Sequence, residues 1–258
     1  MDAIITAGGV PVPGDPLYEY THSSPKALLD IAGKPMIQWV LDAVSASPEI
    51  DHIVVIGLPE LGKIQISKPV TFLPNQVDMI ENIKSGLKEV QKIHPEAEFA
   101  LLVASDIPAI SERMVTELVE KVNQYQVDLI YSVIPKKVME AKYPTSNRTY
   151  TVLKDVAICG GDMNAVRLNI VEKTEALWER LTAARKNPLK QAAILGPEIL
   201  FSLIFKTATL EKAAQLICKR IGITGKALIQ QDAEIGMDVD KPHQLEIMRA
   251  DMAQRTSA

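Results

Sequence analysis

Three polar groupings in the sequence each follow an apolar run that is typical of a buried strand. These groupings are Ala7-Gly8-Gly9 after residues 3–6, Ser105-Asp106-Ile107-Pro108 after residues 99–104, and Gly236 to Pro242 after residues 227–230. Ligands of open parallel sheets bind outside the carboxyl ends of the strands. We therefore expect the chemistry of this protein at these three positions.

The glycine pair and the aspartate after the most apolar run suit different ligands. Gly8 and Gly9 let the backbone approach a ligand and direct N–H groups at a phosphate or a base edge, although a plain tight turn explains them equally well. A carboxylate at Asp106, with Pro108 stiffening the turn, is placed to hold a hard cation through oxygen. Asp106 could instead cap the following helix, but Ser111 lies nearer to that helix and suits the N-cap better.

Two further carboxylates and one lysine could complete such a site. Asp238 and Asp240 stand at i and i+2 on an extended segment, so their side chains point the same way. Asp240 is also expected to cap the last helix, with Pro242 close to its first turn, which leaves Asp238 as the favoured ligand. Lys26 ends a loop that starts at Gly8 and is long for a strand-to-helix connection. A lysine there is an exposed charge in most proteins, but here it is suited to neutralise phosphate.

Apolar runs and helical spacings alternate through the first half of the chain and return near residue 227. The expected strands are residues 3–6, 52–57, 70–73, 99–104, 128–134 and 227–230, and the expected helices are residues 36–44, 77–93, 114–122 and 241–253. This alternation predicts a mostly parallel sheet covered by helices on both faces, a three-layer α/β/α architecture. The chain is expected to be a single domain over residues 1–258, without internal repeats.

Two segments depart from this alternation. Residues 135–150 are polar and rich in Lys, Pro, Ser and Asn, which predicts a loop or a long hairpin. From Glu172 to Arg220 the pattern is helical, with breaks at prolines. This segment is expected to be a helical insertion over residues 172–222 that serves as a lid, a homodimer contact or both.

The composition is that of an ordinary globular chain and excludes several functions. The chain has 258 residues, of which 47% are hydrophobic, 23% charged and 5% aromatic, and its net charge is −4. This charge and the sparse aromatic residues argue against nucleic-acid binding. No apolar stretch approaches the roughly 18 residues that a membrane helix needs, so no membrane contact is expected. Only two cysteines, Cys159 and Cys218, and an N-terminus unlike a signal peptide predict a cytoplasmic protein.

A series of motifs carries a resemblance to a known family. Taken in order, AGG, PKALLDIAGKPMIQWVLDA, VASDIP and MDVDKP resemble the nucleotidyltransferases that build sugar nucleotides and related activated compounds. The resemblance is nearest to the molybdenum-cofactor guanylyltransferase and cytidylyltransferase group, and it spans residues 3–108 and 222–253. It implies a Rossmann-like nucleotide-diphospho-sugar transferase fold.

The resemblance also implies roles for particular residues. In that family a glycine turn faces the nucleotide, a lysine touches the phosphates, two carboxylates bind Mg²⁺, and a polar side chain lies near the base. The corresponding residues are Ala7, Gly8 and Gly9 for the turn, Lys26 for the phosphates, Asp106 and Asp238 (or Asp240) for Mg²⁺, and Asn82 for the base. Family analogy places an acceptor pocket near Gly161 and Asp162, although a turn between a strand and a helix explains this second glycine pair equally well.

The first loop departs from the family pattern, which continues as Gly-Gly-x-Gly-x-Arg. Pro11 stands where the third glycine is expected, and Pro13 stands where the arginine is expected. In the family that arginine grips the triphosphate. Either Lys26 or His22 replaces it here, or the protein has drifted away from catalysis.

The resemblance implies a Mg²⁺-dependent enzyme that moves a nucleoside monophosphate from a nucleoside triphosphate to a phosphorylated or otherwise anionic small molecule and releases pyrophosphate. Three other functions remain open to comparison with the sequence. A glycosyltransferase of the same fold usually carries Asp-x-Asp where this chain has Ser105-Asp106-Ile107. A non-catalytic nucleotide-sensing module would account for the missing arginine, and a dinucleotide-binding dehydrogenase requires a Gly-x-Gly-x-x-Gly pattern that Gly8-Gly9 does not meet.

Overall fold

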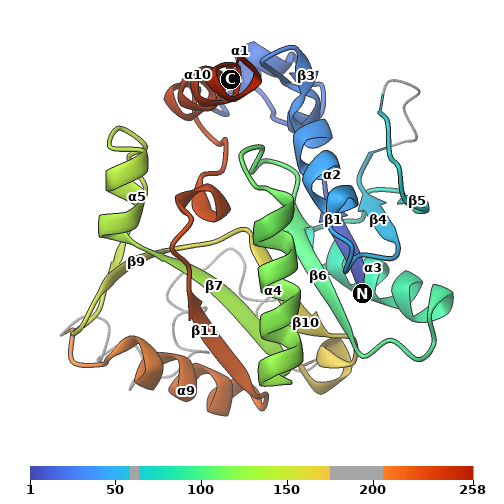
Figure 1. Cartoon of the computed structure of the whole chain (residues 1–258), viewed down its shortest axis with the longest axis vertical. Coiled ribbons are helices and arrows are strands. Elements are labelled where there is room, and N and C mark those ends of the chain that lie inside the picture. Colours follow the sequence, from blue (N-terminus) through green and yellow to red (C-terminus); the bar gives the residue numbers. More distant parts are fainter. Residues whose placement is uncertain (59–63, 175–205, 258) are drawn as a thin grey trace.

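A mixed sheet forms the centre of the molecule (Figure 1). The computed structural model describes residues 1–58, 64–174 and 206–257. In this part of the chain the sheet has nine strands in the order β5-β4-β1-β6-β10-β7-β9-β8, with β11 paired to β7. The strands are β1 (Asp2–Thr6), β4 (Ile53–Ile56), β5 (Val70–Leu73), β6 (Phe99–Ala104), β7 (Leu129–Pro135), β8 (Thr151–Val152), β9 (Ala157–Gly160), β10 (Met163–Arg167) and β11 (Gly225–Ile229), and a separate hairpin contains β2 (Asp30–Ile31) and β3 (Lys34–Pro35).

Helices lie on both faces of the sheet. The described helices are α1 (Tyr18–Thr21), α2 (Met36–Ala46), α3 (Met79–Ile93), α4 (Glu112–Tyr125), α5 (Lys136–Lys142), α9 (Leu210–Ile221) and α10 (Pro242–Ser257), with 3-10 turns η1 (Lys26–Leu28) and η2 (Ala233–Gly236). In Figure 1, α2 and α4 lie on the near side of the sheet and α3 lies behind it.

The parallel core that the apolar runs predict is confirmed. β1 lies between β4 and β6 and pairs in parallel with both, with Ile4 opposite Val54 and Leu102. Ala3 and Ile5 pack in the hydrophobic cluster of α2 and α4, whereas Ile4 packs in the cluster of α3. A strand buried on both faces needs a continuous apolar run rather than an alternating one. The expected three-layer α/β/α architecture is confirmed as well.

The sheet as a whole is mixed because β10 runs antiparallel between β6 and β7. β9 and β10 together lie opposite β7, and residues 130–133 of β7 face residues 160–165. The segment from β9 to β10 therefore holds two more residues than the facing part of β7. These two residues are Gly161 and Asp162, which form a bulge between β9 and β10. Bulges bend a strand, re-aim its side chains and are common beside active sites. The alternative interpretation of this segment, a turn from a strand to a helix, is wrong.

Two other segments bear on the expectations from sequence. Residues 136–142 form helix α5 rather than a loop, and Met139 is its buried residue. A helix of two turns with one buried side chain is too short to show helical periodicity. In the expected insertion, residues 210–221 form α9, and residues 175–205 lie outside the described residues.

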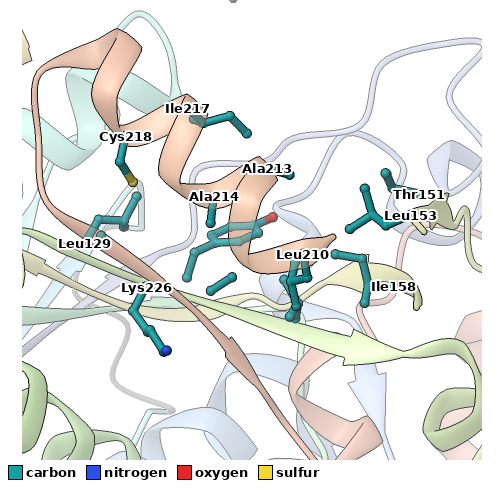
Figure 2. A pocket seen from close by; sticks show the side chains of 14 residues that line it. Leu129, Thr151, Leu153, Ile158, Leu210, Ala213, Ala214, Ile217, Cys218 and Lys226 are labelled. Atoms are coloured by element: carbon teal, nitrogen blue, oxygen red, sulfur yellow. The ribbon is translucent and has the colours of Figure 1, made fainter. Parts of the chain in front are cut away.

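An apolar cavity of about 360 Å³ lies between α9 and the strands β7, β9 and β11. Figure 2 shows Leu210, Ala213 and Ile217 of α9 around this cavity, with Leu153 and Ile158 also lining it. Separately, none of the helices in the described ranges combines the length and the apolar character needed to cross a membrane.

Candidate active site

Lys26 lies between two carboxylates that come from distant parts of the chain. Its Nζ is 2.6 Å from Asp106 Oδ2 and 2.6 Å from Asp240 Oδ1. The side chains of Lys26 and Asp106 are largely buried, with 18% and 16% exposed. The Lys26 backbone N–H donates to the Gly9 carbonyl oxygen at 2.8 Å, which ties the lysine to the glycine turn. The end of β1, the end of β6 and the segment of residues 237–241 between η2 and α10 (the late loop) therefore meet at one ammonium group.

The charge of Lys26 is held by these neighbours. Burial lowers the pKa of its ammonium, but the Asp106 and Asp240 carboxylates outweigh burial, so the pKa is raised above its ordinary value. A permanent, partly desolvated cation of this kind is well suited to bind phosphate oxygens.

Backbone hydrogen bonds draw three loops together around Asp106. The Val239 N–H donates to the Asp106 carbonyl oxygen at 3.0 Å, which fixes the late loop to the end of β6. The Ala104 N–H donates to the Asp162 carbonyl oxygen at 2.9 Å, and the Asp162 N–H donates to Ile235 at 2.8 Å. The bulge thus lies between the end of β6 and η2, and it brings Asp162 into the same site.

Asp162 carries an unusual carboxylate. Its Oδ2 is buried and has no hydrogen-bond partner among the described residues. Burial, together with the nearby Asp106 carboxylate, raises the pKa of Asp162 to about 7. The side chain is therefore divided between protonated and ionised forms near neutral pH.

Arg148 is a site residue that the sequence interpretation missed. Its guanidinium pairs with the Asp238 carboxylate and lies 4.0 Å from Asp162 Oδ2. The side chain is 15% exposed although it belongs to the polar segment after α5. A single arginine in an irregular segment has no periodic signal, so only the folded structure reveals that it reaches the site.

The late-loop carboxylates are divided between two cations: Asp238 pairs with Arg148, and Asp240 pairs with Lys26. The expectation that Asp240 caps the last helix is wrong, because its carboxylate contacts Lys26 and its own N–H donates to Gln244 Oε1. Ser111 does precede α4, but its side chain makes no capping hydrogen bond.

The glycine turn and Asn82 are linked through a residue that the sequence interpretation did not single out, Asn75. Asn82 is buried, and its side chain accepts from the Gln76 N–H and donates to Asn75 Oδ1. A Cβ on Gly8 would lie 2.1 Å from Asn75 Oδ1, so Gly8 permits the approach of this side chain. Asn82 therefore positions Asn75 over the turn instead of facing open space itself.

The remaining predicted residues differ in their surroundings. Ala7 is buried, and Gly161 is buried where a Cβ would lie 3.0–3.1 Å from Ile134, Ser132 and Ile235. A side chain at position 161 would therefore crowd protein atoms rather than reach open space. By contrast, a Cβ on Gly9 would meet no atom within 4 Å, so Gly9 faces open space.

The carboxylates offer oxygen ligands for a divalent cation. The buried Asp106 Oδ1 has no hydrogen-bond partner in the described part of the chain, and Asp240 is held on the same lysine. Across residues 1–58, 64–174 and 206–257 no group of three or more His, Cys, Asp or Glu side chains is arranged to hold a metal. Mg²⁺ usually takes only one or two carboxylates and completes its octahedron with water and substrate phosphates, so the residues present fit it.

Comparison with known proteins identifies the class to which this fold and site belong. Residues 4–234 match the MobA-like NTP transferase domain. The chain belongs to this family of nucleotidyltransferases.

Solved structures agree with this assignment. A hypothetical transferase from Thermus thermophilus superposes with a TM-score of 0.80 at 28% identity, over 95% of this chain and 98% of that one. CMP:2-keto-3-deoxy-manno-octonic acid synthetase in complex with CTP superposes with a TM-score of 0.61 at 20% identity, over 98% of each chain. At that identity the second likeness concerns the fold alone.

One curated enzyme shares sequence with part of the chain. The 2-C-methyl-D-erythritol 4-phosphate cytidylyltransferase of Clostridium botulinum is 27% identical over 125 residues, which cover 45% of this chain and 53% of that enzyme. The aligned region spans about half of the length of that relative.

Proposed function

We propose that this protein transfers a nucleoside monophosphate from a nucleoside triphosphate to a phosphorylated or otherwise anionic small molecule, with release of pyrophosphate. The observation that carries this proposal is the position of Lys26, whose ammonium lies 2.6 Å from both Asp106 and Asp240 beside the open glycine turn at Gly9. Membership of the nucleotidyltransferase family supports the reaction type.

The reaction is a displacement at the α-phosphorus. An acceptor oxygen forms a bond to this phosphorus while the bond to the bridging oxygen breaks, and the electron pair leaves with pyrophosphate. Negative charge spreads over the phosphoryl oxygens, so positioning and electrostatics supply most of the catalysis. Lys26 stabilises the charge that develops on the leaving pyrophosphate.

Asp106 and a late-loop carboxylate are the proposed holders of Mg²⁺, and Asp240 or Asp238 supplies the second ligand. When bound, Mg²⁺ would screen the repulsion between an anionic acceptor and the α-phosphate. Support comes from the unpartnered Asp106 Oδ1 and from the hydrogen bond that fixes Val239, between the two late-loop aspartates, to the Asp106 backbone.

Arg148 is the proposed contact for the acceptor. Its guanidinium lies 4.0 Å from Asp162 Oδ2 in the bulge, and its Nε is buried without a hydrogen-bond partner among the described residues. A guanidinium can bind a phosphate or carboxylate through two parallel hydrogen bonds. An anionic acceptor would therefore compete with Asp238 for Arg148.

The test combines binding with product release. CTP, GTP, UTP, ATP and dTTP are screened by thermal shift with Mg²⁺, and pyrophosphate release is then measured with a panel of sugar phosphates and other phosphorylated acceptors. A nucleotide at a hundredfold excess over its Kd should stabilise the fold by about 2.7 kcal/mol. The variant Asp106→Asn should lose Mg²⁺-dependent nucleotide binding.

The outcomes separate the candidate functions. Pyrophosphate release with one nucleotide and one acceptor supports the transferase. Stabilisation by a nucleotide without pyrophosphate release from any acceptor would favour the non-catalytic sensing module, for which the missing loop arginine is the motivating observation. No stabilisation by any triphosphate would contradict both.

A further inference from the structure

A cavity of about 380 Å³ adjoins Lys26 on the side of the first loop. It is lined by Gly9, Asp15 and Leu17 from the first loop and by Asp240 and Lys241 from the late loop. The loop from Gly9 to Pro25 contains no lysine or arginine but contains Asp15 and Glu19. The loop itself therefore offers no fixed cation to an anion in this cavity.

The charges around the cavity are unevenly paired. Lys26 already contacts two carboxylates, so that group of three carries a net negative charge. Asp15 is used within the loop, where its Oδ2 accepts the Val12 N–H at 2.8 Å. Lys241 is the other lysine that lines the cavity, and no ion pair of its ammonium is found within the described residues. It is exposed and free to move its charge toward a ligand.

The backbone of Lys241 is fixed even though its side chain is exposed. Its carbonyl oxygen accepts the N–H groups of Gln244 and Leu245, each at 3.0 Å, at the start of α10. The preceding residue, Asp240, is held by Lys26 at 2.6 Å. The late loop therefore places the Asp240 carboxylate against Lys26 and, one residue later, the Lys241 ammonium beside the cavity.

From this arrangement, and resting on the proposed function, we infer that Lys241 binds the terminal phosphates of the nucleoside triphosphate. Lys26, whose charge is balanced by Asp106 and Asp240, contacts the β-phosphate, which leaves the α-phosphorus as part of pyrophosphate. Lys241 supplies the additional positive charge that the first loop lacks. A compact ammonium on a flexible stem suits the rounded, highly charged end of a polyphosphate.

The experiment measures how affinity depends on the number of phosphates. Calorimetric titrations with Mg²⁺ and no acceptor compare CTP, GTP, UTP and ATP with the matching monophosphates, for the wild type, Lys241→Met and Lys241→Arg. Lys241→Met removes the charge but keeps most of the stem. The matched control is Lys121→Met, because Lys121 is half-buried on α4 and its ammonium donates to Gln124 Oε1 at 3.1 Å.

Losing one hydrogen bond to a charged group should weaken triphosphate binding roughly 10- to 100-fold in Lys241→Met. Monophosphate binding should change less than about twofold, because a monophosphate lacks the terminal phosphates that Lys241 would contact. Lys241→Arg should restore most of the triphosphate affinity, because arginine keeps the positive charge. Unchanged triphosphate affinity in Lys241→Met, or an equal loss for both ligands, would overturn the inference about Lys241 alone. A wild type that binds no triphosphate would overturn the proposed function as well.

Discussion

The sheet consists of two halves that meet between β6 and β10 and differ in construction. The first half contains the strands β5, β4, β1 and β6, and the second half contains β10, β7, β9, β8 and β11. The first half is parallel, and its strands β1, β4 and β6 are largely buried on both faces. The second half contains antiparallel pairs, a bulge and an apolar cavity of about 360 Å³. The candidate site lies at the border and takes side chains from both halves.

This difference suggests a division of work. The first half supplies the glycine turn, Lys26 and Asp106 from a densely packed framework, whereas the second half supplies Arg148 and the Asp162 bulge from a less filled one. A rigid framework holds reacting groups in place, and a looser one can adapt to different acceptors. Four predictions test this comparison, from the largest expected effect to the smallest.

The same substitution should cost more stability in the first half than in the second. Leu101 in β6 is fully buried, and Leu153 is 6% exposed but lines the cavity under α9. We expect Leu101→Ala to lower the free energy of unfolding by about 4 kcal/mol and Leu153→Ala by about 2 kcal/mol, because the cost rises with the contacts that are lost. Urea unfolding measures both, and equal losses would show that the two halves are packed alike.

At the border itself, Lys26→Ala should act on turnover more than on folding. Loss of one group that stabilises the transition state lowers kcat by at least ~100-fold. Lys34→Ala is the control, since the Lys34 ammonium lies 2.9 Å from Asp42 Oδ2 and contacts none of the candidate site carboxylates within the described residues. Steady-state rates of Lys26→Ala within tenfold of the wild type would remove Lys26 from the chemistry.

Asp162 should make the stability of the border depend on pH. Its pKa is raised to about 7 from an ordinary value near 3.9, so the native state keeps a proton that the unfolded chain releases. Stability should therefore fall as pH rises from about 4 to 7, and Asp162→Asn should flatten this slope. The raised pKa would correspond to about 4 kcal/mol for a fully buried carboxyl and corresponds to roughly 2 kcal/mol here, because 35% of the side chain is exposed to solvent.

Differential scanning calorimetry between pH 4 and pH 8 measures the Asp162 effect. Asp155→Asn serves as the control because Asp155 accepts the Leu210 N–H at 3.0 Å in the second half but lies outside the site. A slope that persists in Asp162→Asn would assign the pH dependence to another group.

The smallest effect is expected at the start of β1, the end of the strand away from the candidate site, where His94 Nδ1 lies 2.7 Å from the buried Asp2 Oδ2. This hydrogen bond raises the pKa of His94 above its ordinary value. The protonated histidine is favoured in the folded state, so its stabilisation is complete below about pH 6.5 and is lost as pH rises through the raised pKa. His94→Gln should abolish this small loss of Tm, and a Tm profile identical to the wild type would contradict it.

The first half and its share of the site could be predicted from sequence because both depend on local patterns. The continuous apolar runs of β1, β4 and β6 identify buried parallel strands, and strand ends identify where Lys26 and Asp106 should meet. Asp106 directly follows β6, and the Gly9 carbonyl oxygen after β1 accepts the Lys26 N–H, so the two groups meet where these neighbouring parallel strands end.

The second half could not be predicted in the same detail because its structure depends on distant pairing. β10 enters the sheet between β6 and β7, and nothing in residues 163–167 specifies that position. The bulge at Asp162 arises from a mismatch in register with β7, which is invisible in a single segment. Arg148 and Asn75 lie in irregular segments. Arg148 reaches the site through its contacts with Asp238 and Asp162, and Asn75 reaches it through its contact with Gly8.

The ion pair between Lys26 and Asp240 spans 214 positions in the chain. A ribosome adds about 5–20 residues per second, so Lys26 is made roughly 10–40 s before the partner that completes its surroundings. During synthesis the nascent chain can form β1, β4 and β6 and hold Asp106 beside the lysine, but it cannot yet enclose a ligand. The candidate site can therefore be completed only late in translation, after the strands β1, β4 and β6 have been made.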